Sequence, residues 1–301
     1  MTALLQPADA PPVEDQAPRQ GSNLRAALRA FLRNRLGVLG ALIVVGMALF
    51  CFVGPLVYHT DQIHTHLNQV HLPPSAGHPL GTDDVGYDVL GRLMVGGQSS
   101  LEVGVAAALI ATAFGALWGA VAGFASRWAD SVMMRVVDAL LSVPPILLLL
   151  FLATIHRPSV PLLILVVSIV SWLIPSRLVR GEVLVLRERD FVRAARLFGV
   201  KRHRIIIRHL IPNSIGTLVV NASFQVADAI LLLASLSYLG LGLPPPAADW
   251  GGMLSNGINY LYSGYWWLVY PPGVAIVLTV VGFNFIGDAL REALEVRLRQ
   301  R

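Results

Sequence analysis

The sequence predicts an all-α, polytopic membrane protein with six transmembrane helices, and three observations carry this prediction. Hydrophobic residues make up 55% of the chain and charged residues only 14%, whereas soluble proteins carry about 25% charged residues. Six apolar stretches are each long enough to cross the hydrocarbon core of a bilayer. Basic residues flank these stretches unequally, so the net charge of +5 indicates membrane orientation and not a nucleic-acid partner.

The N-terminal part of the chain, residues 1–22, is rich in Pro, Ala and Gln and has no apolar period, which predicts a disordered tail. No signal-peptide pattern precedes the first span. Leu and Arg residues at helical spacing predict an amphipathic surface helix over 24–36. The first span follows over about 37–58. Residues 23–98 thus form a unit of surface helix, first transmembrane helix and extracytoplasmic loop.

The loop before the second span contains five histidines, which are His59, His64, His66, His71 and His78. Imidazoles at this density could bind a metal, but no Cys and no tight set of acidic residues completes a site. We therefore interpret the segment as a solvated loop and predict no metal site. The only cysteine, Cys51, excludes an intrachain disulfide.

The second span, about 103–124, carries a small residue at every fourth position: Ala111, Gly115, Gly119 and Gly123. Such a stripe lets another helix approach closely, and it predicts a helix–helix seam. The third span, about 136–155, contains Pro144 and Pro145, which should kink or break it. The fourth span covers about 158–178.

A basic stretch follows the fourth span, and its core, about 190–199, predicts a short helix. Asp190 suits the start of this helix and Gly199 its end. Helical spacing places four residues on one face, namely Phe191, Ala194, Ala195 and Phe198, while Arg193 and Arg196 point elsewhere. The helix is too short and too charged to span a bilayer. It should dock against a cytosolic protein, and binding to a lipid surface is the alternative.

The fifth span, about 214–243, carries a polar stripe. Polar groups inside a span are costly in lipid and normally face a partner or a watery path. Interhelical hydrogen bonding and a substrate pathway are both open as explanations. The stripe consists of Thr217, Asn221, Gln225, Asp228 and Ser235. The sixth span, about 268–287, leads into a C-terminal tail over 292–301.

The distribution of basic residues predicts the topology. Every Lys and Arg except Arg92 and Arg157 lies on the side of the two termini. The positive-inside rule therefore places both termini and the 190–199 helix in the cytoplasm. The chain has no Gly-x-x-x-x-Gly-Lys-Ser/Thr loop, and its only lysine is Lys201. We therefore expect no nucleotide site in this chain and no enzymatic activity of its own.

Ala194-Ala195, Gly199 and Pro212 match the spacing of a known coupling motif, which reads Glu-Ala-Ala, three residues, Gly, nine residues, Ile-x-Leu-Pro. Arg193 stands at the position of its Glu, and His209 and Ile211 at those of its Ile and Leu. Segments 80–92, 122–138, 237–254 and 287–291 match the same proteins. The chain thus resembles inner-membrane permeases of binding-protein-dependent ABC importers, specifically the second permease of the dipeptide/oligopeptide/nickel group. The resemblance covers about residues 24–298.

The resemblance implies a type I importer fold, with five spans and the coupling helix inside a core of residues 99–291. It also implies a location in the bacterial inner membrane beside lipid and a heterodimer with a homologous permease. Two ATPase subunits, or one fused ATPase, would bind ATP and Mg, and this chain would hold no cofactor. An extracytoplasmic binding protein would deliver the substrate. The residues expected to couple to the ATPase are Phe191, Arg193, Ala194, Ala195, Phe198, Gly199 and Pro212.

Three functional hypotheses follow for this chain. The first is a permease subunit that forms half of the pathway for di- and oligopeptides. The second is a nickel or metal-chelate importer of the same family, for which the histidine-rich loop is the only local support. The third, from another class, is an ion-coupled secondary transporter with Asp138 and Asp228 as coupling carboxylates. Such a transporter has no need of a docking helix.

Overall fold

The computed structural model describes residues 29–154 and 157–299, with side chains described as far as Leu294. Within these residues the chain is helical apart from its loops and one isolated β-bridge between Thr82 and Asp88. The all-α prediction is confirmed. The helices are α2 Arg35–Phe52, α3 Gly54–Val57, α4 Val89–Phe124, α5 Arg127–Leu141, α6 Pro145–Ala153, α7 Val160–Ser171, α8 Leu173–Leu186, α9 Asp190–Leu197, α10 Arg202–Ile205, η1 Ile206–Leu210, α11 Ile211–Asn213, α12 Ile215–Leu236, η2 Ser237–Leu241, α13 Trp250–Ile258, η3 Leu261–Ser263, η4 Trp266–Leu268 and α14 Tyr270–Arg299.

Parts of two predicted segments fall outside the described residues. The predicted tail over 1–22 lies wholly outside them, as do residues 24–28 of the predicted surface helix. Residues 29–33 of that helix are helical. At the other end, the predicted tail over 292–301 is a continuation of α14 as far as Arg299. The helix continues because its last described side chains still pack: Ala293 is buried, and Leu294 lies against Gly216 at the start of α12.

Six crossings of the membrane fit the described helices. Four helical segments are long and apolar enough to span alone, namely Arg35–Phe52, Val89–Phe124, Ile215–Leu241 and Trp266–Leu294. Two bent pairs, α5 with α6 and α7 with α8, supply the other two if each pair crosses once. α4 has 36 residues and is about 54 Å long, which exceeds the hydrocarbon thickness. It begins at Val89, well before the predicted start at 103, because Asp88 caps it.

Prolines account for both bends. α5 ends at Leu141 and α6 begins at Pro145, with an angle of 82° between them, so the predicted break at Pro144-Pro145 is confirmed. The second bend, 44° between α7 and α8, is not anticipated in the sequence analysis. Pro175 has no N–H to donate to the carbonyl four residues earlier, which belongs to Ser171. The helix bends there, and the Ser171 carbonyl is left free for another partner.

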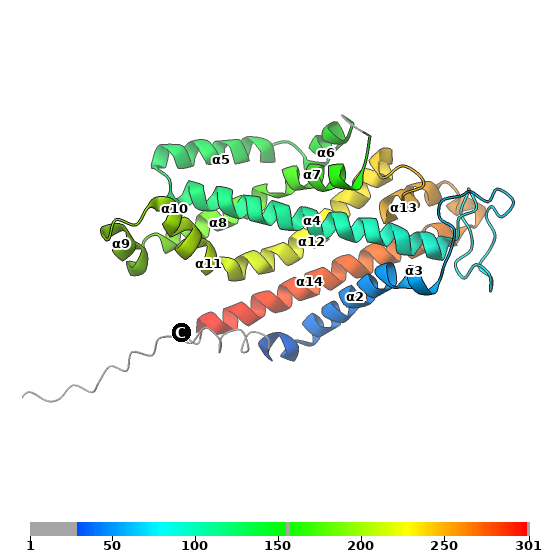
Figure 1. Ribbon diagram of the computed structural model, residues 1–301, viewed down its shortest axis with the longest axis horizontal. Coiled ribbons are helices and arrows are strands. Elements are labelled where there is room, and N and C mark those ends of the chain that lie inside the picture. The colour runs from blue at the N-terminus through cyan, green and yellow to red at the C-terminus, as the bar shows by residue number, and fades with distance from the viewer. Residues whose placement is uncertain (1–28, 155–156, 300–301) are drawn as a thin grey trace, which may run out of the picture.

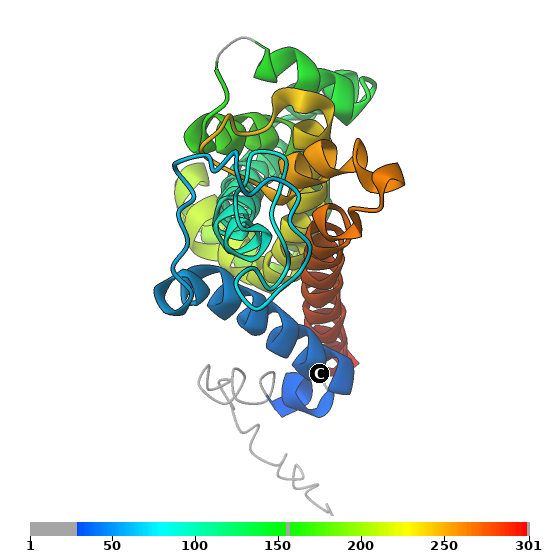
Figure 2. The same cartoon turned by 90° about the vertical axis from the view of Figure 1, so that its right-hand side faces the viewer.

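α4 runs through the centre of the bundle, with α7, α8, α12 and α2 packed around it (Figure 1). α14 lies along both α2 and α12, which Figure 2 shows from the end of the bundle. The predicted small-residue seam is the contact between α4 and α8. A Cβ atom at Gly115 would lie 2.6 Å from Trp172 O, and one at Gly119 would lie 2.2 Å from Ser176 O. Only glycine permits these backbones to lie so close.

Two ion pairs join α5 to α8. The Arg180 guanidinium holds the Asp130 carboxylate with two hydrogen bonds of 2.6 and 2.8 Å. Arg177 pairs with Asp138. Asp138 is therefore engaged in holding two helices together, which weakens its assignment as an ion-coupling carboxylate.

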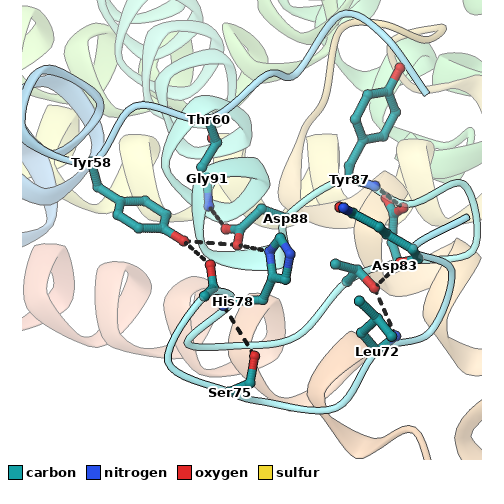
Figure 3. A network of polar contacts seen from close by, with 12 residues as sticks. Tyr58, Thr60, Leu72, Ser75, His78, Asp83, Tyr87, Asp88 and Gly91 are labelled. Carbon is teal, nitrogen blue, oxygen red and sulfur yellow. Dashed lines mark hydrogen bonds and ion pairs between the residues drawn. The ribbon is translucent and has the colours of Figure 1, made fainter. Parts of the chain in front are cut away.

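The loop between α3 and α4 forms a hydrogen-bonded cap around Asp88 (Figure 3). The Asp88 carboxylate accepts from Tyr58 Oη and contacts His78 Nδ1, each at 2.9 Å, and it caps α4 by accepting from Gly91 N at 2.8 Å. These contacts tie the end of the first span to the start of α4.

Two other histidines of this loop also have local partners. His64 pairs with Asp61, and the backbone N–H groups of His64 and Ile63 hold the pKa of Asp61 well below its usual range. The His71 ring stacks on that of Tyr265 at 4.5 Å. In the part of the chain that the structure describes, no three His, Cys, Asp or Glu side chains gather as a metal site.

Candidate functional site

The short helix α9 lies at one end of the molecule, far from the loop around Asp88 at the other end (Figure 1). α8 leads into it, and α10, η1 and α11 lead from it back to α12. Its bounds, Asp190–Leu197, agree with the predicted helix. The loop between α8 and α12 thus presents α9 outside the bundle of spans.

The two faces of α9 differ from the predicted ones. Val192 is fully buried and packs into a cluster with Val183 and Leu210, and Ala195 is half-buried against the same cluster. A short helix needs such an anchor on its own protein, and positions three apart provide it. Ala195 thus packs partly against its own protein, and its contact with a partner stays a prediction. The sequence analysis missed Val192, which anchors the helix.

The outward surface of α9 is apolar at its C-terminal end. Leu197 is 88% exposed and Phe198 is 86% exposed, while Phe191 is 43% exposed. Ala194 is also exposed. We call these four residues, Phe191, Ala194, Leu197 and Phe198, the α9 outer surface. Large apolar side chains this exposed on a part of the chain outside the spans indicate contact with another surface.

Gly199 ends α9 in the left-handed conformation, with φ of +70°. Its N–H donates to Arg196 O at 3.0 Å, and the N–H of Val200 donates to Ala195 O at 3.1 Å. This pair of bonds is a Schellman motif, which fits the predicted role of Gly199 as a helix stop. The motif fixes the direction of the chain directly after Phe198.

The arginines of α9 hold contacts within the chain. Arg193 donates to Glu188 at 3.3 Å, and this hydrogen bond is the main cause of the lowered pKa of Glu188. The Arg196 guanidinium lies 4.5 Å from the centre of the Phe124 ring. Pro212 is exposed in α11, after the π-helix η1, and so lies on the return path to α12. The remaining coupling residue, Phe191, approaches this return path, because its ring lies 6.4 Å from that of His209.

The polar stripe on α12 divides into residues with and without partners. Gln225 is buried, and its Nε2 donates to Ser171 O, the carbonyl left free by Pro175, at 2.5 Å. Ser235 donates to Leu231 O of its own helix at 2.8 Å. Thr217 is half-buried. Asn221 Oδ1 is buried and has no described partner, and Asp228 is exposed and has none. Interhelical hydrogen bonding thus explains Gln225 and leaves Asp228 unexplained.

Asp228 lines a cavity of about 280 Å³. The walls come from the break between α5 and α6, the bend between α7 and α8, and α12. Most lining side chains are aliphatic, and the polar ones are Ser171, Gln225 and Asp228. The cavity itself could not be predicted, since its walls come from three separate stretches of the chain.

A second cavity, of about 400 Å³, lies at the end of the molecule that carries the Asp88 loop. Arg92 is buried beside it and donates to Pro246 O at 2.8 Å and Ala247 O at 3.3 Å, and its guanidinium lies 4.4 Å from the centre of the Tyr87 ring. In the sequence analysis, Arg92 appears only among the basic residues that predict the topology. The signal that could have identified Arg92 as a structural anchor is its position as a single charge within the apolar start of α4.

Comparison with known proteins agrees with this arrangement of spans and external helix. A family model described as the binding-protein-dependent transport system inner membrane component matches residues 115–300, and one described as the N-terminal TM domain of oligopeptide transport permease C matches residues 22–74. The chain belongs to the family of binding-protein-dependent transport system inner membrane components, the permeases of ABC importers. Within that family it groups with the C-type permeases of oligopeptide and dipeptide systems.

Three similar proteins illustrate the relationship. The chain is 38% identical to the oligopeptide transport system permease protein OppC of Bacillus subtilis (strain 168), over 91% of this chain and 90% of the relative. It is 42% identical to a putative peptide permease protein of Brucella suis biovar 1 (strain 1330), over 92% of each. It is 40% identical to the probable D,D-dipeptide transport system permease protein DdpC of Escherichia coli (strain K12), over 86% of this chain and 87% of the relative.

Family membership fixes the general role of the molecule. The chain is a membrane-embedded transport permease and not an enzyme in itself, and a permease of this family works with ATPase and substrate-binding partners. The sequence-based recognition and fold class are confirmed.

Proposed function

We propose that this chain forms half of the translocation pathway of an ATP-driven importer for di- and oligopeptides, and that α9 couples it to the cytosolic ATPases. The observation that carries this proposal is the α9 outer surface. Val192 anchors the helix from behind while Leu197 and Phe198 stay more than four-fifths exposed. An anchored helix with exposed apolar residues can transmit motion from a partner into the bundle, because it moves together with the cluster beneath it.

The peptide substrate is supported by the relatives, which are named as oligopeptide, dipeptide and D,D-dipeptide permeases. The nickel alternative gains nothing from the loop, since three of its five histidines, His64, His71 and His78, contact neighbouring side chains. The secondary-transporter alternative needs two free carboxylates, and Asp138 is paired with Arg177.

The assembly we propose contains a second, homologous permease and two ATPase subunits or one fused ATPase. ATP and Mg bind to the ATPases, and this chain contributes no nucleotide site. A substrate-binding protein delivers peptide from the outside. Both termini and α9 lie in the cytoplasm, which the excess of basic residues on that side supports. The α9 outer surface enters the ATPase, and lipid surrounds the spans.

Reconstitution of the complete importer in liposomes tests the proposal. We expect uptake of a radiolabelled dipeptide that requires ATP, the binding protein and this chain. Nickel uptake without peptide uptake would favour the metal alternative. Uptake driven by an ion gradient, with no ATPase that co-purifies, would instead overturn the assignment to an ATP-driven complex.

A further inference from the structure

The carboxylate of Asp228 stands at the middle of a transmembrane helix. The candidate span Ile215–Leu241 has 27 residues, and Asp228 is thirteen residues from either end. At 1.5 Å per residue it lies about 20 Å from each end of the helix. A charged group at this depth costs about 2.5–3.5 kcal/mol on insertion scales, and such residues normally face a cavity or a partner. Its position therefore calls for a compensating group.

The side chains that line the cavity beside Asp228 include hydrogen-bond acceptors and no basic residue. Asp228 is the only charged residue among those that line the 280 Å³ cavity. Ser171 lines the same cavity, is nine-tenths buried, and its Oγ has no described hydrogen-bond partner. Asn221 Oδ1, one turn along α12 from Gln225, also lacks one, but Asn221 is not among the residues that line the cavity. No described basic side chain reaches Asp228. The cavity thus presents unused acceptors that a cation with N–H donors would satisfy.

The rest of the cavity fits the body of a small organic cation. Its other walls are aliphatic, with Leu140, Leu148, Val170 and Leu232 among them. Two helix breaks border it, at Pro145 and at the Ser171–Leu173 bend, and such discontinuous helices near the midplane are typical of substrate sites in transporters. The Ser171 carbonyl already accepts a hydrogen bond from Gln225. Asp228 is therefore the group in the cavity that can bind a cation strongly.

We propose that this cavity is a transit site for the terminal ammonium group of the transported peptide, with Asp228 as the group that binds the ammonium and Ser171 beside it. The inference rests on the proposed peptide-importer function and adds a substrate feature read by the permease itself. A free amino terminus offers three N–H donors and one positive charge, which match the unpaired acceptors.

The test compares Asp228→Asn with the unmodified protein in the reconstituted importer. Two substrates are used, a dipeptide with a free amino terminus and its N-acetylated form, and each rate is expressed relative to the unmodified protein. The binding protein's own preference then cancels. We expect the free peptide's uptake to fall about tenfold, because a charge-assisted hydrogen bond is lost, and the acetylated peptide's uptake to change less than twofold. Asp228→Glu should keep the preference.

Chemical labelling of Asp228 tests the site even for a peptide that the binding protein does not deliver to the permease. A hydrophobic carbodiimide should modify Asp228 in the assembled permease, and the free peptide, but not the acetylated one, should slow this modification. Glu102→Gln is the matched control, since it removes an exposed carboxylate of α4 outside the cavity lining. Peptide uptake by the importer that carries Glu102→Gln should be unchanged.

Several outcomes would overturn the inference. Equal loss of both peptides in Asp228→Asn, or no loss of either, would contradict ammonium binding, as would labelling that peptide does not slow. Failure of Asp228→Asn to assemble with the second permease would also contradict the inference, because Asp228 would then serve assembly and not substrate transit. If the unmodified importer transports no peptide at all, the proposed function fails, which is a distinct result.

Discussion

Replacing Gly199 by valine should uncouple ATP hydrolysis from transport while the spans still insert and assemble. Gly199 has φ of +70°, a conformation that costs an ordinary residue about 1–2 kcal/mol and a β-branched one more. No atom lies within 4 Å of the position a Cβ would take, so the effect comes from the backbone alone. A cost of 1.4 kcal/mol changes an equilibrium about tenfold. The Schellman motif should open and move Phe198 out of place.

The measurement for Gly199→Val is peptide uptake and ATPase rate in the same liposomes. Uptake should fall about tenfold or more, as that equilibrium shift requires, with the ATPase no longer stimulated by loaded binding protein. Gly199→Asn should keep most of the activity, since Asn tolerates the left-handed conformation. Gly181→Val is the matched control, at an exposed position of α8 where a Cβ also meets no atom. Normal transport by Gly199→Val would contradict the importance of this helix end.

Replacing Gly119 by leucine should prevent the protein from folding stably. A Cβ at this position would lie 2.2 Å from Ser176 O and 2.9 Å from Arg180 N, both backbone atoms of α8. Overpacking a core usually costs about 1–3 kcal/mol when side chains can move. Here the obstacle is backbone, so α4 and α8 must separate, and the cost should lie at or above the top of that range.

Thermal unfolding in detergent, followed by size-exclusion chromatography, measures the effect of Gly119→Leu. We expect a large loss of folded protein and a lowered melting temperature. Gly46→Leu is the matched control, because Gly46 is a span glycine at which a Cβ has no neighbour within 4 Å. A Gly119→Leu protein as stable as the Gly46→Leu protein would show that α4 and α8 do not pack as the structure has them.

Features set by nearby residues could be predicted from the sequence. The start and end of α9 follow from Asp190 and Gly199, and the break in the third span follows from Pro144 and Pro145. The glycine stripe also predicted close packing of α4, although only the structure shows that its partner is α8. In each case the information lies within a few turns of one helix.

Features that join distant residues could not be predicted. Val192 is the inward residue of α9 because Val183 and Leu210 lie beneath it, and the helix itself carries apolar residues on more than one side. The hydrogen bond from Gln225 to Ser171 depends on a carbonyl freed by Pro175 on another helix. The bend at Pro175 had a readable cause, but the polar stripe on α12 divides into paired and unpaired members only when its neighbours are known.

The central claim is that the α9 outer surface contacts the ATPase, and photo-crosslinking from position 198 tests it most directly. A benzophenone-bearing phenylalanine analogue placed at Phe198, which is 86% exposed, should form a covalent product with the ATPase subunit in the assembled importer. The same analogue at Leu42, exposed on α2, should not. An ATPase product formed equally from both positions, or crosslinking at position 198 to lipid alone with the ATPase present, would contradict the account.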